Sequence, residues 1–205
     1  MCTIREVDLA VVAVVSNTDP PQEDIMPTKI KEVIKEWGCT WMWKSLQLVG
    51  SDEGIKGAIE GSTLVAVTDG SYIKERYPHL CSSAFLLKCR KGSGRLSVSF
   101  PDCSQGANAY RGELMGLMAI HLILLAANKV WSSLRGRAVI YSDCLVALGR
   151  VSNLPPHHIP TKCRHSDILK NILVNCTSLS FMLAYSHVKS HQDDHEEFST
   201  LPRLA

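Results

Sequence analysis

A short apolar run that leads into an acidic turn limits most strongly what this chain can fold into. Leu64–Val67 is a continuous apolar stretch, and Asp69, Gly70 and Ser71 follow it. Apolar runs rich in β-branched residues are typical of central strands that are covered on both faces. Asp, Gly and Ser favour turns. Residues 63–69 are therefore predicted to form a buried strand that ends on a carboxylate, which either shapes a turn or serves a site.

A second apolar run leads to a second acid. Arg137–Ser142 is predicted to form another buried strand, and Asp143 follows it. Between the two strands, residues 108–128 repeat their apolar side chains at helical spacing, and Glu113 lies in the first turns. Such a helix supplies the crossover that two parallel strands need. Because parallel strands end at the same edge of a sheet, where α/β sites form, Asp69, Glu113 and Asp143 are expected to converge there.

The remaining segments complete an α/β layout. We expect further strands at 80–89, 96–100 and 179–188, and helices at 29–38, 55–59, 145–151 and 167–174, the last with Ser166 as its N-cap. Residues 90–95 read as a hairpin turn, whose basic side chains either are solvated or contact phosphate. Trp41–Leu48 continues as a strand or as an irregular packing segment, and Val7–Val15 is one possible extra strand. This order predicts a mixed five-stranded sheet with helices on both faces.

Composition narrows the class of protein. The chain has 205 residues, 45% of them hydrophobic and 20% charged, which suffices for a sizeable core. The net charge of +2 neither requires nor forbids a nucleic-acid partner. The 8 cysteines are scattered and form no CxxC pair, which favours buried free thiols over disulfides or a zinc site. The apolar runs are short for a membrane span, so we expect an intracellular protein, nuclear or cytoplasmic, without a membrane partner.

Three converging carboxylates indicate metal chemistry. Carboxylates that lie close together repel one another unless cations neutralise them. Hard oxygen ligands with an open face suit Mg²⁺ or Mn²⁺. Two such ions can activate a water molecule and stabilise the leaving oxygen in phosphodiester hydrolysis.

The motifs around these acids resemble those of the ribonuclease H family, especially the ribonuclease H domains of reverse-transcriptase-bearing retroelements. The resemblance rests on four segments in the family's order: Thr68–Ser71, Tyr110–Leu114, Tyr141–Asp143 and His187–Asp194. On this basis residues 63–205 are interpreted as a ribonuclease H-like domain, and residues 1–62 as an N-terminal extension and connection segment. The resemblance further implies association with a reverse transcriptase module in a longer polyprotein.

By this resemblance Asp69, Glu113 and Asp143 would bind two Mg²⁺ (or Mn²⁺) ions, and His191 would assist product release or proton transfer. The implied reaction is endonucleolytic hydrolysis of the RNA strand of an RNA–DNA hybrid. The family reads the shape of the hybrid through contacts to its backbone and 2′-hydroxyl groups. The candidate contacts of this kind are Ser71, Asn108, Tyr110 and Arg111, and Tyr110 is equally well a core residue.

The C-terminal part departs from the family pattern. The family carries a fourth metal-binding Asp on a final helix, and this sequence stops at residues 201–205, where that helix would begin. The alternative interpretation is therefore a catalytically inactive, truncated ribonuclease H-like remnant or nucleic-acid-binding module. Three histidines, His187, His191 and His195, recur every four residues and would share a face on a helix. They are either zinc ligands or part of a solvated loop, and the preceding strand favours the loop.

Overall fold

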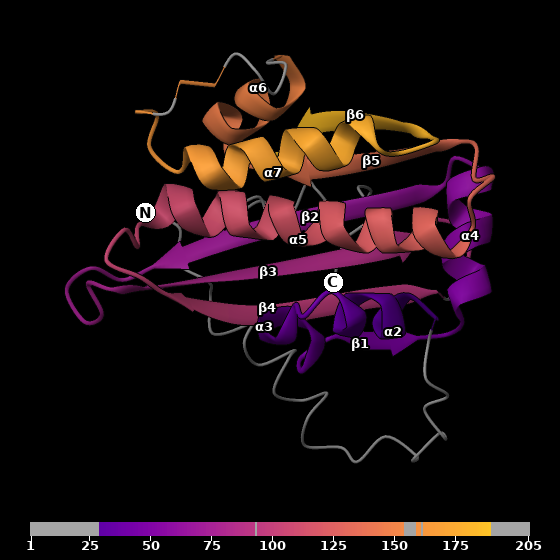
Figure 1. Ribbon diagram of the computed structural model, residues 1–205, viewed down its shortest axis with the longest axis horizontal. Helices are drawn as coiled ribbons and strands as arrows, with labels where there is room; N and C mark the ends of the chain where they lie inside the picture. The colour runs from indigo at the N-terminus through magenta and orange to yellow at the C-terminus, as the bar shows by residue number, and fades with distance from the viewer. Residues whose placement is uncertain (1–28, 93, 154–158, 161, 190–205) are drawn as a thin grey trace, which may run out of the picture.

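The structure of the chain is a computed structural model that describes residues 29–92, 94–153, 159–160 and 162–189 (Figure 1). The helices are α2 (Lys29–Glu36), α3 (Thr40–Trp43), α4 (Asp52–Glu60), α5 (Ala109–Val130), α6 (Leu145–Asn153) and α7 (Ser166–Thr177). The strands are β1 (Gln47–Val49), β2 (Leu64–Tyr72), β3 (Leu80–Cys89), β4 (Arg95–Cys103), β5 (Arg137–Ser142) and β6 (Met182–His187). Several predictions concern residues outside the described part of the chain. These are the possible strand at Val7–Val15, the roles of His191 and His195, and the C-terminal residues.

The strands form one mixed sheet in the order β1-β4-β3-β2-β5-β6. β2 pairs in parallel with β5, and β5 with β6, whereas β2, β3, β4 and β1 pair antiparallel. This confirms the predicted α/β fold with a mixed sheet and a parallel central pair. The sheet has six strands and not five, because the short strand β1 adds to the edge at β4.

The hydrophobic core lies between the sheet and α5, which packs over β2 and β3 roughly along the strands, with α7 at its side (Figure 1). Alternate residues of the central strands, such as Leu64, Ala66 and Ile140, join this core. By length and composition α5 is apolar enough to cross a membrane, yet 67% of its most apolar window is buried inside the protein. In this fold α5 is the central core helix, as its spacing predicts.

The segment before β2 is part of the same core. Ile30 and Ile34 of α2, Met42 of α3 and Ile55 of α4 are fully buried within one cluster that also contains the residues of α5. α2 packs directly on α5. The predicted helices at 29–38 and 55–59 are therefore present, and residues 29–62 contribute to the packing of the sheet.

Strand β2 is longer than predicted, and Asp69 lies within it. The parallel pairing with β5 ends at Val67, which lies opposite Tyr141. The antiparallel pairing with β3 continues as far as Tyr72, which lies opposite Cys81. Beyond Val67 the strand is thus held by β3 alone, so that Asp69 leaves the paired centre of the sheet on the side where β5 has ended.

The structure tests three smaller predictions: the N-cap of α7, the hairpin between β3 and β4, and the state of the cysteines. The N-cap of α7 is His165, in the left-handed conformation (φ 58°), and Ser166 is the first helical residue. The predicted hairpin between β3 and β4 is present, and Arg90 at its turn donates a 2.7 Å hydrogen bond to Tyr141 Oη. The seven described cysteines are free, as predicted, but only Cys81 and Cys89 are buried.

The close approach of α5 to β2 gives a first testable prediction. A Cβ atom at Gly116 would lie 1.9 Å from Thr68 Oγ1, which itself donates a 3.0 Å hydrogen bond to the carbonyl oxygen of Ala84. Because Thr68 is only 3% exposed and an added methyl group would displace its hydrogen-bonded hydroxyl, Gly116→Ala should lower the free energy of unfolding by about 2 kcal/mol. Urea unfolding followed by circular dichroism measures this loss.

Two companion variants isolate the cause. Thr68→Ala in the Gly116→Ala background removes the opposing oxygen and should restore part of the lost stability, which a double-mutant cycle detects. Gly149 in α6 has no neighbouring atom within 4 Å of an added Cβ, so Gly149→Ala should be neutral or should stabilise by up to about 1 kcal/mol. Equal unfolding free energies for Gly116→Ala and the wild type would contradict the tight contact.

Candidate metal centre

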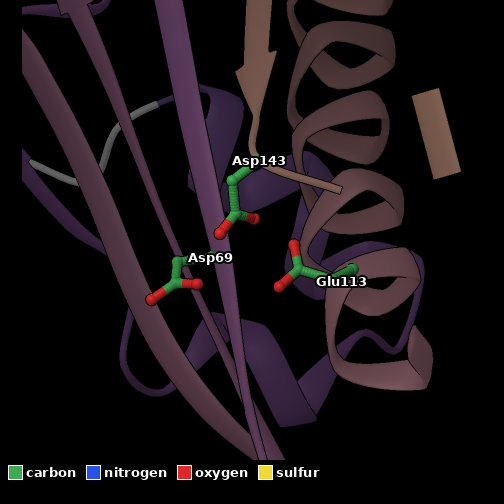
Figure 2. Close-up of side chains that lie close together, drawn as sticks. All are labelled: Asp69, Glu113 and Asp143. Atoms are coloured by element: carbon green, nitrogen blue, oxygen red, sulfur yellow. The ribbon is translucent and has the colours of Figure 1, made fainter. Parts of the chain in front are cut away.

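The three predicted carboxylates meet at one end of the sheet (Figure 2). Asp69 comes from β2, Glu113 from the first turns of α5, and Asp143 directly follows β5. One carboxylate oxygen from each residue lies within 4.8 Å of the others. Glu113 is 5% exposed, whereas Asp69 and Asp143 are half-buried. The predicted convergence of the three acids is thus confirmed.

Glycines at the helix–strand contact bring Glu113 to this position. A Cβ at Gly70 would lie 2.5 Å from the backbone nitrogen of Glu113, and a Cβ at Gly112 would lie 3.0 Å from the carbonyl oxygen of Ser82. Only glycine allows backbones to approach so closely. Ser83 adds a 2.7 Å hydrogen bond from its Oγ to the carbonyl oxygen of Gly112. The first turn of α5 is thereby fixed against β2 and β3.

Both oxygens of the Glu113 carboxylate accept hydrogen bonds from the strands. The backbone N–H of Gly70 donates to Oε1 at 2.8 Å, and Ser142 Oγ lies 3.4 Å from Oε2 as the second donor. Ser142 Oγ in turn accepts a 3.0 Å hydrogen bond from the backbone N–H of Cys144. Sequence reasoning did not single out Ser142, although it lies inside the Tyr141–Asp143 motif.

The electrostatics of the cluster favour a cation. Burial is the main cause that raises the pKa of Glu113 to about 8, and the negative charges of Asp143 and Asp69 raise it further. The hydrogen bonds from Gly70 and Ser142 act in the opposite direction. Three carboxylates that offer only oxygen ligands, and that destabilise one another's charge, fit Mg²⁺ or Mn²⁺. The donor set present here therefore suits the hard divalent ions that the sequence implies.

Two of the predicted substrate contacts, Asn108 and Arg111, form bonds at the start of α5. Asn108 is the N-cap of the helix, and its Oδ1 accepts a 3.0 Å hydrogen bond from the backbone N–H of Arg111. The guanidinium group of Arg111 forms an ion pair with Asp102 at the end of β4. This pair lowers the pKa of the Asp102 carboxyl against the effect of its burial. A role of Asn108 and Arg111 in substrate contact stays a prediction.

The other two predicted contacts, Ser71 and Tyr110, lie nearby and are half-buried. Ser71 follows Asp69 by two residues in β2, and therefore lies on the same side of the strand. The Tyr110 ring faces the guanidinium group of Arg150 at 5.6 Å, and its buried hydroxyl finds no hydrogen-bond partner among the described residues. Tyr110 thus combines core packing with an unsatisfied polar group.

His187 contacts the backbone of Asp143, next to the carboxylate cluster. It is the last residue of β6, and its Nε2 donates a 3.1 Å hydrogen bond to the backbone carbonyl oxygen of Asp143. Because His187 belongs to a strand, the described structure gives no support to a helical zinc site that would include it. The family resemblance implies a role of His191 in proton transfer or product release; this residue lies outside the described part of the chain, and that role stays a prediction.

Comparison with known proteins yields structural relatives only. No family model matches the sequence, and no curated protein matches it. Solved structures similar to this chain include ribonuclease H1 of the halophilic archaeon Halobacterium salinarum, with 13% identity, a TM-score of 0.48, and coverage of 64% of this chain and 89% of that one. The PFV ribonuclease H domain has 16% identity and a TM-score of 0.48, and the match covers 63% of this chain and 81% of that one. LC11-RNase H1, solved in complex with an RNA/DNA hybrid, has 9% identity and a TM-score of 0.43, over 65% of this chain and 89% of that one. Ribonuclease H domains are thus among the structures that resemble this chain, as its motifs predict.

Proposed function

We propose that this chain is a divalent-metal-dependent endonuclease that hydrolyses the RNA strand of RNA–DNA hybrids. The observation that carries the proposal is the cluster of Asp69, Glu113 and Asp143, whose oxygens lie within 4.8 Å of one another at one end of the sheet. The hybrid as the substrate class is supported by the resemblance of the surrounding motifs to the ribonuclease H family.

In this proposal the three carboxylates hold two Mg²⁺ or Mn²⁺ ions. When bound, such ions supply an activated water molecule and stabilise the leaving oxygen. The chain orients Glu113 through the hydrogen bonds from Gly70 and Ser142, so that the carboxylate is already placed before an ion arrives. His191 would receive or supply a proton, or would help the product to leave.

The substrate would lie across the end of the sheet where the carboxylates gather. Ser71, Asn108, Tyr110 and Arg111 all belong to β2 or to the start of α5, next to Asp69 and Glu113. In the proposal they contact the sugar–phosphate backbone and 2′-hydroxyl groups. Such contacts would distinguish RNA from DNA without reading the base sequence. As an intracellular module linked to a reverse transcriptase, the chain would act on hybrids formed during reverse transcription.

A cleavage assay with a metal titration tests the proposal. The folded 205-residue chain is incubated with a hybrid whose RNA strand is end-labelled, in Mg²⁺, Mn²⁺, Ca²⁺ or EDTA. We expect internal cuts in the RNA strand with Mg²⁺ or Mn²⁺, none in EDTA, and none in a DNA duplex of the same sequence. A folded chain that never cuts the hybrid with either metal would refute the enzymatic proposal, and hybrid binding without cleavage would favour the inactive binding module.

A further inference from the structure

We propose that Ser142 is a positioning residue of the metal centre, which holds the Glu113 carboxylate in place for divalent ions. The inference rests on the proposed function, because it takes Glu113 as a metal ligand. Ser142 is the last residue of β5 and is 0% exposed. It alternates with Ala138 and Ile140, whose side chains face the core beneath α5, so its hydroxyl points toward the helix that carries Glu113.

The hydrogen-bond pattern gives the Ser142 hydroxyl a defined direction. Its Oγ accepts the 3.0 Å hydrogen bond from the backbone N–H of Cys144, which occupies the acceptor side of the oxygen. Its proton is then free for Glu113 Oε2 at 3.4 Å, an oxygen that can only accept when the carboxylate is ionised. The order Cys144 N–H, Ser142 O–H, Glu113 carboxylate is therefore set for the ionised carboxylate, which is the form that binds a cation.

The two donors to Glu113 come from two neighbouring strands, β2 and β5. Gly70 in β2 binds Oε1, and Ser142 in β5 binds Oε2. Asp69 and Asp143, the other two carboxylates, are the direct neighbours of these donors in the sequence. The two strands that carry the aspartates thus also hold the Glu113 side chain in one conformation. Ion binding then costs less side-chain conformational entropy, because the carboxylate is already ordered.

The consequence is specific to ion binding. Without the Ser142 hydroxyl, the carboxylate of Glu113 keeps its bond to Gly70 but loses its second donor and can turn about that contact. Ser142→Ala should therefore weaken the affinity for Mn²⁺ by about threefold to tenfold, which is the range that one hydrogen bond supports. The Mg²⁺ concentration for half-maximal cleavage should rise by a similar factor, whereas the affinity for hybrid in Ca²⁺ should not change.

Two further variants separate positioning from general packing. Ser142→Thr keeps the hydroxyl and should retain wild-type Mn²⁺ affinity. Ser180→Ala removes a hydroxyl that bonds Asn128 Oδ1 at 2.6 Å and the carbonyl oxygen of Leu134 at 2.7 Å. Asn128 lies 15 residues after Glu113 in α5, about 22 Å along the helix axis. Ser180→Ala should lower the melting temperature but leave the Mn²⁺ affinity unchanged.

The decisive measurement is the Mn²⁺ dissociation constant of each full-length variant, determined by calorimetry without nucleic acid. Weaker binding in Ser142→Ala alone supports the inference. Equal Mn²⁺ affinity in Ser142→Ala and the wild type overturns it, and so does the same loss in Ser180→Ala. A wild-type chain that binds no Mn²⁺ overturns the metal centre itself. A wild type that binds Mn²⁺ without cleaving the hybrid refutes only the proposed reaction, because the affinities still decide the role of Ser142.

Discussion

Asp69→Asn should lower hybrid cleavage by about 100-fold or more and should leave the metal-free protein at least as stable as the wild type at pH 8. The amide has the shape of the carboxylate but no charge, so it cannot neutralise a divalent ion at a site that depends on charge. In the absence of metal, the charge of Asp69 contributes to the raised pKa of Glu113. Its removal therefore relieves repulsion in the folded state.

The opposite signs of these two effects distinguish a functional residue from a structural one. Cleavage is measured in excess enzyme with Mg²⁺, and stability by urea unfolding in EDTA at pH 8. Asp167→Asn is the matched control, since Asp167 is an exposed acid in the first turn of α7, outside the cluster. It should retain wild-type cleavage. An Asp69→Asn protein that cleaves hybrid within a factor of about three of the wild type would exclude Asp69 as an essential ligand.

The convergence of the acids could be predicted because it follows from rules that local sequence obeys. Apolar runs predict β2 and β5, helical spacing predicts α5, and the crossover between parallel strands places their ends at one edge. Asp69, Glu113 and Asp143 meet for this reason. The fold and the carboxylate cluster can thus be predicted from a single sequence.

The exact setting of Asp69 could not be predicted, because it depends on tertiary pairing. Asp69, Gly70 and Ser71 carry turn-forming residue types, yet β3 pairs with all three and keeps them in the strand. Gly70 is needed for another reason, since a Cβ there would lie 2.5 Å from the backbone nitrogen of Glu113. A residue that suggests a turn is in fact a point of close approach between strand and helix.

The role of residues 29–62 was likewise hidden. The spacing of Ile30 and Ile34 predicts an amphipathic helix, but not the surface on which it packs. In the structure both side chains are fully buried in the core that α5 shares. The sequence left Trp41–Leu48 as a strand or an irregular segment. The structure has the short helix α3 (Thr40–Trp43) at its start and β1 (Gln47–Val49) at its end, and a strand of three residues is too short to show a pattern of alternation. Partners that lie far apart in the sequence leave no local signal.

Metal-free wild-type protein should lose about 2 kcal/mol of unfolding free energy between pH 6.5 and pH 8, and saturating Mg²⁺ should remove this loss. The pKa of Glu113 is raised from 4.5 to about 8 in the folded protein. Between these values the unfolded chain releases a proton that the folded protein keeps, so stability falls as pH rises and the loss is complete above pH 8. Stability falls by up to about 1.36 kcal/mol for each pH unit in this range, which gives a loss of about 2 kcal/mol between pH 6.5 and pH 8.

His121 sets the lower limit of this window. It is 0% exposed, and burial lowers its pKa from 6.5 to about 4. Its Nδ1 donates a 2.6 Å hydrogen bond to the carbonyl oxygen of Leu117, so the neutral ring accepts at Nε2 from Tyr185 Oη at 2.8 Å. Because the unfolded chain gains a proton below pH 6.5 that the folded protein does not take up until about pH 4, stability falls there as pH falls. The two groups oppose each other below pH 6.5, and above it His121 no longer contributes.

Urea unfolding in EDTA at half-unit steps from pH 6 to pH 8.5 measures the effect, with Glu113→Gln as the test variant. Glutamine cannot ionise, so the decline above pH 6.5 should vanish, and Mg²⁺ should no longer stabilise the protein more strongly as pH rises. Glu75→Gln, at an exposed site, should keep the wild-type decline. If the wild type is equally stable at pH 6.5 and pH 8 in EDTA, Glu113 does not carry the raised pKa that burial beside Asp69 and Asp143 requires. The three carboxylates would then not repel one another strongly enough to favour the binding of a cation at this end of the sheet.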